Sequence, residues 1–338
     1  MPQSFSGSSP PKVSSTTRAE LRCSLDEVRL EIGADPRELL RDIAYRFRAF
    51  PPTDGKADAL VELTASDNAD TAIPRPRGPA RKLFEAEHEL EYYPESGLLY
   101  LADTNIAAEC DLAGGVLRIA VRANDRRAVF LASHLFLTLP LVEILKRHER
   151  FAVHAGGVAL RGRCVLFPGV SGAGKSTLVL ACVRAGWDFL GDDLVLLRES
   201  DGAELQVHGF PDEIDLTEES LRFFPELMAT ADATRRWPKH RISPLDVPHL
   251  RLASSVPPAA LVFPLRVAGR ARLVPVSADE ALVALVPNVI RTERHTAQRH
   301  LDVLATLART VPAYHLEIAD PLAAPSLLLD LIDPSSRH

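Results

Sequence analysis

Residues 169–176 form a glycine-rich segment that constrains the fold of this chain more than any other part of the sequence. The segment fits G-x-x-x-x-G-K-[ST] at every fixed position, with the residues Gly169, Val170, Ser171, Gly172, Ala173, Gly174, Lys175 and Ser176. Residues 164–168 before it are apolar and typical of a strand, and residues 177–185 after it predict a helix. In such a unit, backbone N–H groups and the helix N-terminus face an anion, and the lysine adds a cation. We therefore predict that residues 169–177, including Thr177, bind the phosphates of a nucleotide; the alternative is an accidental glycine-rich turn.

The overall composition is that of an ordinary globular protein with a small excess of acids. The chain of 338 residues is long enough for two domains, is 46% hydrophobic and carries a net charge of −6. This charge argues against nucleic acid or an anionic membrane as a partner, and we find no apolar run as long as a membrane span. The four cysteines include no C-x-x-C pair, which favours reduced core residues over metal ligands. We expect a soluble cytoplasmic protein.

The first part of the sequence predicts a disordered arm and a small α+β domain. Residues 1–17 are rich in serine and proline and predict the arm, and residues 18–150 predict the domain. Within this domain, strands are expected at Leu25–Ile32, Leu98–Ala102, Ala108–Leu112 and Val116–Val121. A helix is expected over residues 36–50, a loop or sheet edge over residues 51–70, and one or two helices over residues 128–148 with a break near Pro140.

The second domain is expected to span residues 151–338. Strands are predicted at Phe151–Leu160, Cys164–Pro168, Trp187–Leu197, Leu205–Gly209 and Tyr314–Ile318, the first two forming a hairpin. Helices are predicted at Thr217–Met228, Ala278–Leu285, Ala297–Thr310 and Pro321–Leu331. A second hairpin is expected between Leu261–Val267 and Ala271–Val276, and a long loop over residues 233–250.

An adjacent pair of acids follows the predicted nucleotide-binding helix. Asp192 and Asp193 lie within the apolar run of residues 187–197, and neighbouring side chains on a strand point to opposite faces. Both carboxylates reach one site only if the backbone bends there, which Gly191 permits. One acid could then hold Mg²⁺ while the other accepts a proton from an attacking hydroxyl. The alternative is a pair of turn acids before a strand.

Three segments carry a resemblance to a known family. They are His154-Ala-Gly-Gly-Val-Ala-Leu, residues 164–176, and Arg184-Ala-Gly-Trp-Asp-Phe-Leu-Gly-Asp-Asp. Their residues and spacing resemble the catalytic core of HPr kinase/phosphorylase, a family whose fold is similar to that of phosphoenolpyruvate carboxykinase. The resemblance covers residues 151–198. It implies an α/β fold with a C-terminal P-loop kinase domain of this type, preceded by the smaller α+β domain.

The same resemblance implies the chemistry of the site. ATP would be the phosphate donor and a serine hydroxyl the acceptor. Lys175 would bind the β- and γ-phosphates, Ser176 would help to hold Mg²⁺, and His154 would line the site. Asp192 and Asp193 would share the roles of base and metal ligand, and we favour Asp192 as base and Asp193 as metal ligand. The family's second signature is absent, and Phe210-Pro-Asp-Glu-Ile-Asp-Leu stands in its place.

These observations favour an ATP-dependent kinase that acts on a hydroxyl, most simply a serine of a peptide or small protein. A small-molecule kinase on the same fold and a nucleotide-binding regulator with little catalysis are the alternatives. Lys239 and Arg241 flank His240 in the predicted loop and could neutralise the transferred phosphoryl group, although a solvated loop explains them equally well. Residues 18–150 are expected to recognise the acceptor or pack against a partner subunit, so a homo-oligomer is compatible with the sequence; the alternative is a purely structural lid.

Overall fold

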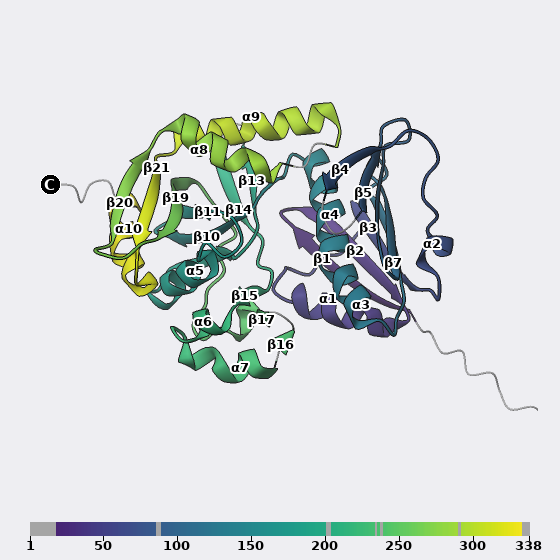
Figure 1. The fold of residues 1–338 in the computed structure, drawn as a ribbon, viewed down its shortest axis with the longest axis horizontal. Coiled ribbons are helices and arrows are strands. Elements are labelled where there is room, and N and C mark those ends of the chain that lie inside the picture. The colour runs from purple at the N-terminus through teal and green to yellow at the C-terminus, as the bar shows by residue number, and fades with distance from the viewer. Residues whose placement is uncertain are drawn as a thin grey trace, which may run out of the picture.

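The computed structural model describes residues 18–85, 89–200, 204–233, 235–236, 239–289 and 292–332. The arm predicted over residues 1–17 lies outside these ranges. The described residues form a mixed α/β fold, and Figure 1 shows two halves side by side. The first half extends to the end of helix α4 at Arg147, and the second half begins with strand β9 at Phe151.

Within the described residues, the first half is built on one eight-stranded sheet with the order β1-β2-β3-β8-β7-β6-β5-β4. Strands β2, β3 and β8 run parallel to one another, and the other neighbours are antiparallel. The strands are β1 (Ala19–Leu25), β2 (Val28–Asp35), β3 (Ala59–Ala65), β4 (Arg81–Glu85), β5 (Glu89–Tyr93), β6 (Leu98–Asp103), β7 (Ile106–Asp111) and β8 (Val116–Val121). The helices are α1 (Leu40–Arg46), α2 (Ala69–Ala72), α3 (Arg126–Ser133) and α4 (Leu135–Arg147).

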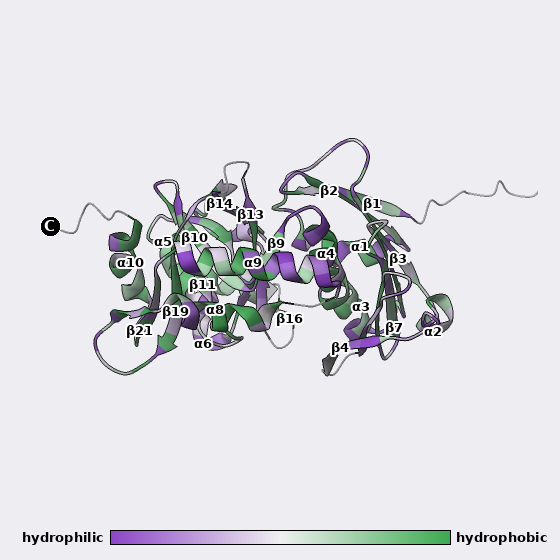
Figure 2. Ribbon diagram, turned by 90° about the horizontal axis from the view of Figure 1, so that it is seen from above, coloured by the Kyte–Doolittle hydropathy of each residue, from purple (hydrophilic) through white to green (hydrophobic). Residues whose placement is uncertain are grey.

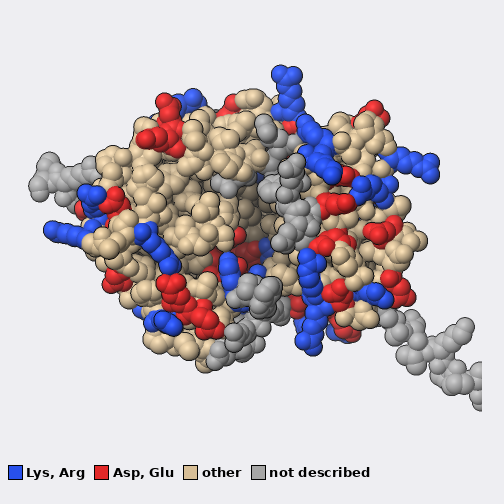
Figure 3. Space-filling view, viewed as in Figure 1, with Lys and Arg blue, Asp and Glu red and all other residues tan. Residues whose placement is uncertain are grey.

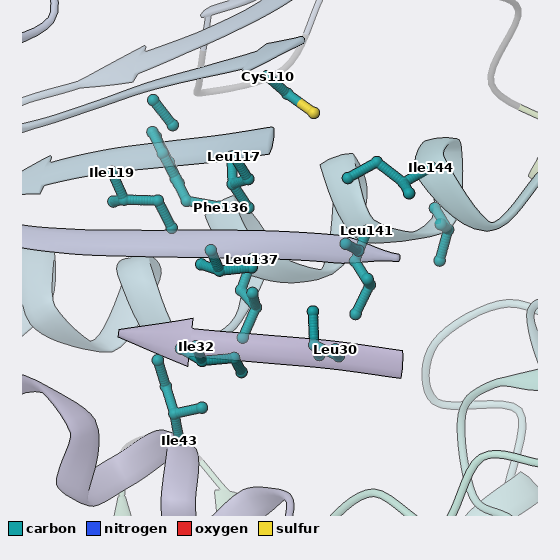
Figure 4. Packing of buried hydrophobic residues seen from close by; sticks show 14 of the residues in the cluster. Leu30, Ile32, Ile43, Cys110, Leu117, Ile119, Phe136, Leu137, Leu141 and Ile144 are labelled. Carbon is teal, nitrogen blue, oxygen red and sulfur yellow. The ribbon is translucent and has the colours of Figure 1, made fainter. Parts of the chain in front are cut away.

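Helices α1, α3 and α4 cover one face of this sheet. Figure 4 shows Phe136, Leu137 and Leu141 of α4 packed against apolar strand residues such as Ile32 and Leu117. Residues 126–147 are long and apolar enough to cross a membrane by length and composition, which the sequence analysis had not recognised. In the fold, 67% of the most apolar window of this stretch is buried, so these residues form the core of the first half.

Two predictions for the first half were wrong. The stretch over residues 51–70, expected to be a loop or sheet edge, contains β3, which lies inside the sheet between β2 and β8. Its alternation of buried Ala59, Val61 and Leu63 was obscured by the polar and proline-rich residues around it. The break in the helical stretch falls at His134, not at Pro140, which lies inside α4. The other strands predicted for this half are present, within a few residues at their ends.

Among the described residues, three sheets make up the second half. A six-stranded sheet has the order β12-β10-β11-β19-β21-β20, a four-stranded sheet has the order β18-β14-β13-β9, and a small sheet has the order β15-β17-β16. The strands are β9 (Phe151–Val153), β10 (Ala155–Leu160), β11 (Arg163–Pro168), β12 (Asp188–Gly191), β13 (Val195–Glu199), β14 (Leu205–Gly209), β15 (Ile214–Leu216), β16 (Arg235–Arg236), β17 (Lys239–Ile242), β18 (Ser255–Val256), β19 (Pro258–Arg266), β20 (Arg272–Val276) and β21 (Ala313–Ile318). The helices are α5 (Lys175–Arg184), α6 (Glu218–Leu221), α7 (Met228–Ala233), α8 (Ala278–Leu285), α9 (Arg294–Thr310) and α10 (Ala324–Ile332).

Seen from above, helices α4 and α9 lie at the junction of the two halves (Figure 2). Charged contacts join the halves around this junction. Arg299 of α9 pairs with Glu149, and Arg147 of α4 pairs with Glu293 just before α9. At another point of the junction, Asp26 in the β1–β2 turn contacts Arg150 and His208.

The two strands that flank the predicted site each divide and pass from one sheet to another. The expected strand over residues 151–160 is β9 and β10, separated at His154, and the expected strand over residues 187–197 is β12 and β13, separated at residues 192–194. Strand β10 pairs with β12 in the six-stranded sheet, whereas β9 pairs with β13 in the four-stranded sheet. His154 and the acidic pair therefore lie together where the two strands change sheets.

Three further predictions for the second half need correction. Strands β19 and β20 do not form a hairpin, because β21 lies between them, parallel to β19 and antiparallel to β20. The stretch over residues 233–250 contains β17, which pairs with β15, so it is not simply a loop. The helix capped by Thr217 ends at Leu221, although the cap is present and accepts the N–H of Ser220. The hairpin of β10 and β11 is confirmed, with Arg161 and Gly162 at positive φ in its turn.

Candidate functional site

The glycine-rich segment joins strand β11 to helix α5, which is the strand–turn–helix unit expected from the sequence. Gly172 and Gly174 have φ values of +84° and +97°, a left-handed conformation that glycine adopts without strain. Gly174 directly precedes the helix, so the N–H groups of the first turn of α5 open toward the loop. A helix N-terminus that follows such a turn is able to bind an anion.

Lys175 is enclosed by the surrounding residues, and only 5% of its surface is exposed. Its Nζ donates to the carbonyl oxygens of Gly169 at 2.9 Å and Val170 at 3.3 Å. It also lies 3.1 Å from Nε2 of His154 and 3.7 Å from a carboxylate oxygen of Asp193. Burial lowers the pKa of Lys175, although the Asp193 and Asp192 charges oppose this shift. The ammonium group is therefore held at the centre of the loop, facing the acidic pair.

Asp192 is the buried member of the pair, with 1% of its surface exposed. Its Oδ2 accepts the hydroxyl of Ser176 at 3.0 Å and the backbone N–H of Asp215 at 2.9 Å, while its Oδ1 is buried without a hydrogen-bond partner. Burial, followed by the nearby charge of Asp193, raises the pKa of the Asp192 carboxyl to about 7. The bend behind it needs Gly191, because a Cβ there would lie 2.2 Å from the carbonyl oxygen of Leu194.

Asp193 lies on the outer side of the same bend and has a side chain that is 67% exposed. One of its oxygens is 3.3 Å from Nδ1 of His154, whose other ring nitrogen faces Lys175. Burial lowers the pKa of His154, and Lys175 adds to this effect, whereas Asp193 opposes it. A neutral His154 can accept a hydrogen bond from Lys175 while donating one to Asp193, and it thereby links the loop lysine to the exposed acid.

A cavity of about 410 Å³ lies beside Asp193 and His154, between the two halves. We call it the inter-half cavity, and Figure 3 shows a hollow between the halves with acidic and basic side chains in its floor. The first half contributes residues of α1, α3 and α4, and the second half contributes residues of the bend and of β15 and β17. The lining residues include Arg46, Phe130, Leu131, His134, Leu135, Leu139, Val142, Glu143, Lys146, His154, Asp193, Leu194, Asp212, Glu213, Asp215 and Arg241.

A second cavity, of about 360 Å³, lies beside the glycine-rich turn. Its walls include Ala173, Gly174 and Thr177 of the turn and the start of α5. Apolar residues such as Phe223 and Pro264 complete it, together with Arg266. The hydroxyl of Thr177 lies 3.0 Å from that of Ser220, so this side chain is tied to α6 and does not point toward Lys175. One cavity is therefore lined by Asp193 and His154, and the other is lined by the turn and the start of α5.

The structure divides the three residues of the predicted basic loop. Lys239 and Arg241 approach the site from β17, where each pairs with Asp215, at 3.2 Å and 2.9 Å. His240 is buried and contacts the carbonyl oxygen of Ala231 and Glu218 instead. Lys239 and Arg241 therefore lie near the acids, whereas His240 belongs to the packing of the small sheet.

Sequence reasoning missed site residues that are distant in sequence from the glycine-rich segment. Asp215 and Glu213 were seen only as a departure from the family pattern, and no catalytic feature was recognised before residue 151. The structure nevertheless places Arg46 of α1 and His134 beside the cavity, paired with Asp212 and Glu213. The acidic run at residues 212–215 was the only available signal.

The residues beside Asp192 offer oxygen donors to a divalent cation. Among the described residues, no group of three or more His, Cys, Asp or Glu side chains forms a metal site. Mg²⁺ in nucleotide sites usually takes one or two protein oxygens and completes its shell with phosphates and water. The unpartnered Oδ1 of Asp192 and the adjacent hydroxyl of Ser176 supply two such oxygens, so the donor set fits Mg²⁺ bound together with a nucleotide.

Comparison with known proteins gives limited information. No protein-family model and no curated protein matches the sequence. Among solved structures, the HPr(Ser) kinase/phosphatase from Coxiella burnetii is similar to part of this chain, with a TM-score of 0.33 and 14% sequence identity. The match covers 53% of this chain and 88% of that chain. A likeness at this level carries no information on activity or substrate, so any functional assignment depends on the geometry of the site.

Proposed function

We propose that the protein is an ATP-dependent kinase that transfers the γ-phosphate to a hydroxyl group. The observation that carries this proposal is the convergence of Lys175, Ser176 and both acids where two strands change sheets. A protein that only binds nucleotide needs the loop and the lysine. It does not need a second, exposed carboxylate that faces a cavity on the far side of the lysine.

The two acids are proposed to have different roles, set by their burial. Asp192 and Ser176 would hold Mg²⁺, which when bound offsets charge on the phosphates. Asp193 would be the base, because it is exposed and lines the inter-half cavity. This is the reverse of the order favoured from the sequence, in which the direction of the backbone bend was unknown.

The transfer step follows from these positions. The carboxylate of Asp193 accepts the proton of the acceptor hydroxyl, and the hydroxyl oxygen forms a bond to the γ-phosphorus. The bond from that phosphorus to the β–γ bridging oxygen breaks, and ADP leaves. Lys175 stabilises the charge on the phosphate oxygens, and His154 holds Asp193 in position. The nucleoside would lie in the cavity beside the start of α5.

The test is the transfer of radiolabel from the γ-phosphate of ATP, with Mg²⁺, to components of a heat-inactivated cell extract. Lys175→Met keeps the buried aliphatic stem and removes the charge, so we expect it to abolish label transfer in a protein that still folds. Lys56→Met, at an exposed position far from the loop, is the control and should transfer label like wild type. Equal transfer by the wild type and Lys175→Met proteins would refute the proposed site.

A nucleotide-binding regulator with little catalysis is the second candidate. The side chain of Lys175 donates hydrogen bonds to carbonyl groups of its own loop. This arrangement favours a regulator, because it can stabilise the loop in the absence of turnover. The regulator would bind MgATP and give neither labelled ester nor labelled inorganic phosphate. Binding without any product would therefore favour this candidate over the kinase.

A further inference from the structure

The inter-half cavity has the dimensions of a small-molecule site. Its volume of about 410 Å³ lies within the usual range of such pockets, roughly 300–1,000 Å³, and pockets of this kind occur preferentially at junctions between domains. Both halves form its walls, so a ligand inside it is enclosed on two sides. Asp193 lines this cavity with a side chain that is 67% exposed, so its carboxylate is accessible to a ligand that enters the cavity.

One wall of the cavity is apolar. Leu135, Leu139 and Val142 are spaced at i, i+4 and i+7, so they lie on one face of α4, and this face lines the cavity. Leu135 and Leu139 are only partly buried although they belong to a core helix. Phe130 of α3 and Leu194 at the bend extend the apolar surface. This wall suits an apolar body next to the reacting hydroxyl.

The rest of the lining is polar, and each of its lysine and arginine side chains pairs with a carboxylate that also lines the cavity. Arg46 pairs with Asp212, Arg241 pairs with Asp215, and Lys146 pairs with Glu143. Asp193 and Glu213 each lie nearest to a histidine, at 3.3 Å and 3.1 Å. Each also has one cation at a longer distance, Lys175 at 3.7 Å from Asp193 and Arg241 at 4.0 Å from Glu213. Every lysine and arginine that lines the cavity already has a carboxylate beside it, so a carboxylate or phosphate on the ligand would meet no unpaired cation there. A neutral or cationic polar group is compatible with this lining.

We propose that the hydroxyl acceptor is a small molecule with an apolar body and no anionic group, bound in the inter-half cavity with its hydroxyl toward Asp193. The proposal rests on the proposed kinase function, and it selects the small-molecule acceptor over the peptide or protein serine. The apolar part of the acceptor lies against α4, and its polar part lies toward Glu213. Recognition thus depends on side chains from both halves.

The experiment separates acceptors by size and charge before the reaction. A heat-inactivated extract of the cells that make the protein is divided by ultrafiltration into peptides and proteins on one side and small molecules on the other. The small molecules are then passed over an anion exchanger. Each fraction is incubated with the full-length protein, Mg²⁺ and ATP radiolabelled at the γ-phosphate. Label is expected in the small-molecule flow-through. Label in the peptide and protein fraction, or only in the anionic small molecules, would overturn the proposal.

A cavity-filling variant tests the location. Leu139→Trp should reduce label transfer at least about tenfold while the affinity for MgATP stays unchanged, because it fills the acceptor cavity and not the nucleotide site. Leu329→Trp, at an exposed position of α10, is the matched control and should transfer label like wild type. If Leu139→Trp does not fold, the same measurement is made on Leu135→Phe, which is a smaller change on the same face of α4. Wild-type transfer by a folded cavity variant would contradict this site. Absence of label in every fraction despite MgATP binding would contradict the kinase function itself.

Discussion

Asp192→Asn is expected to stabilise the metal-free protein near pH 8, although it removes a residue of the proposed active site. Asp192 is buried, and its pKa is raised from 3.8 to about 7. Between these two values the folded state binds a proton that the unfolded state has released, so stability falls as pH rises. The asparagine side chain keeps an oxygen for Ser176 and for the N–H of Asp215, and it carries no charge. The variant therefore avoids the cost of burying a carboxylate.

The expected size follows from the shift. One pKa unit corresponds to 1.36 kcal/mol, so the shift from 3.8 to about 7 corresponds to at most about 4 kcal/mol at pH 8. At pH 5 only about 1.7 kcal/mol of this cost is present. The advantage of the variant should thus grow by up to about 2.5 kcal/mol between pH 5 and pH 8. The asparagine nitrogen takes the place of Oδ1, which already has no hydrogen-bond partner. The cost of burying a polar atom without a hydrogen bond is therefore common to both proteins.

The assay is urea denaturation with a chelator present, at about pH 5 and about pH 8. Asp193→Asn is the matched control. It should give a smaller gain, because its carboxylate is 67% exposed and affects stability mainly by raising the pKa of Asp192. A stability difference between wild type and Asp192→Asn that does not change with pH would refute the reasoning. A variant less stable than wild type at pH 8 would refute it as well.

Two further substitutions test the scaffold of the site. Gly156→Ala should lower turnover at least about tenfold in a folded protein. The Cβ of the new alanine would lie 2.7 Å from Cγ2 of Val179 and would displace α5. Unchanged kinetics would contradict the close packing of β10 on this helix. Asp26→Asn should destabilise the protein by about 1–3 kcal/mol at pH 7 in urea denaturation. Burial alone would raise the pKa of Asp26, but His208 and Arg150 outweigh it and hold the pKa below its ordinary value. The difference from wild type should therefore begin to shrink as pH falls below about 3.9 and vanish below the lower pKa of the folded carboxyl. Equal stability at pH 7 would contradict a role of this carboxylate in joining the halves.

Local features of the sequence predicted local parts of the structure. The strand, turn and helix around Lys175 were predicted because glycine, apolar strand and uninterrupted helix follow one another within one short segment. The sequence showed only that Gly191 permits a bend at the acidic pair, and the structure contains this bend, where glycine alone leaves room for the carbonyl of Leu194. In both cases the determining contacts are close in sequence.

Contacts between distant segments could not be predicted in the same way. Strand β21 separates β19 from β20, and nothing in the two flanking sequences distinguishes this arrangement from a hairpin. Similarly, Arg46 meets Asp212 only because α1 packs against the second half. The roles of Asp192 and Asp193 depended on which side of the bend is buried, and burial is a property of the whole fold.

The central claim is that Asp193 takes the proton of the acceptor while Asp192 lies on the metal side of the phosphates. The most direct measurement is turnover at saturating MgATP, together with the affinity for MgATP, for wild type, Asp192→Asn and Asp193→Asn. Loss of a general base lowers turnover roughly 10²–10⁴-fold, so Asp193→Asn should lose turnover by this factor and bind MgATP like wild type. Asp192→Asn should instead lose both turnover and the Mg²⁺-dependent part of nucleotide affinity. Full turnover by Asp193→Asn would contradict the account.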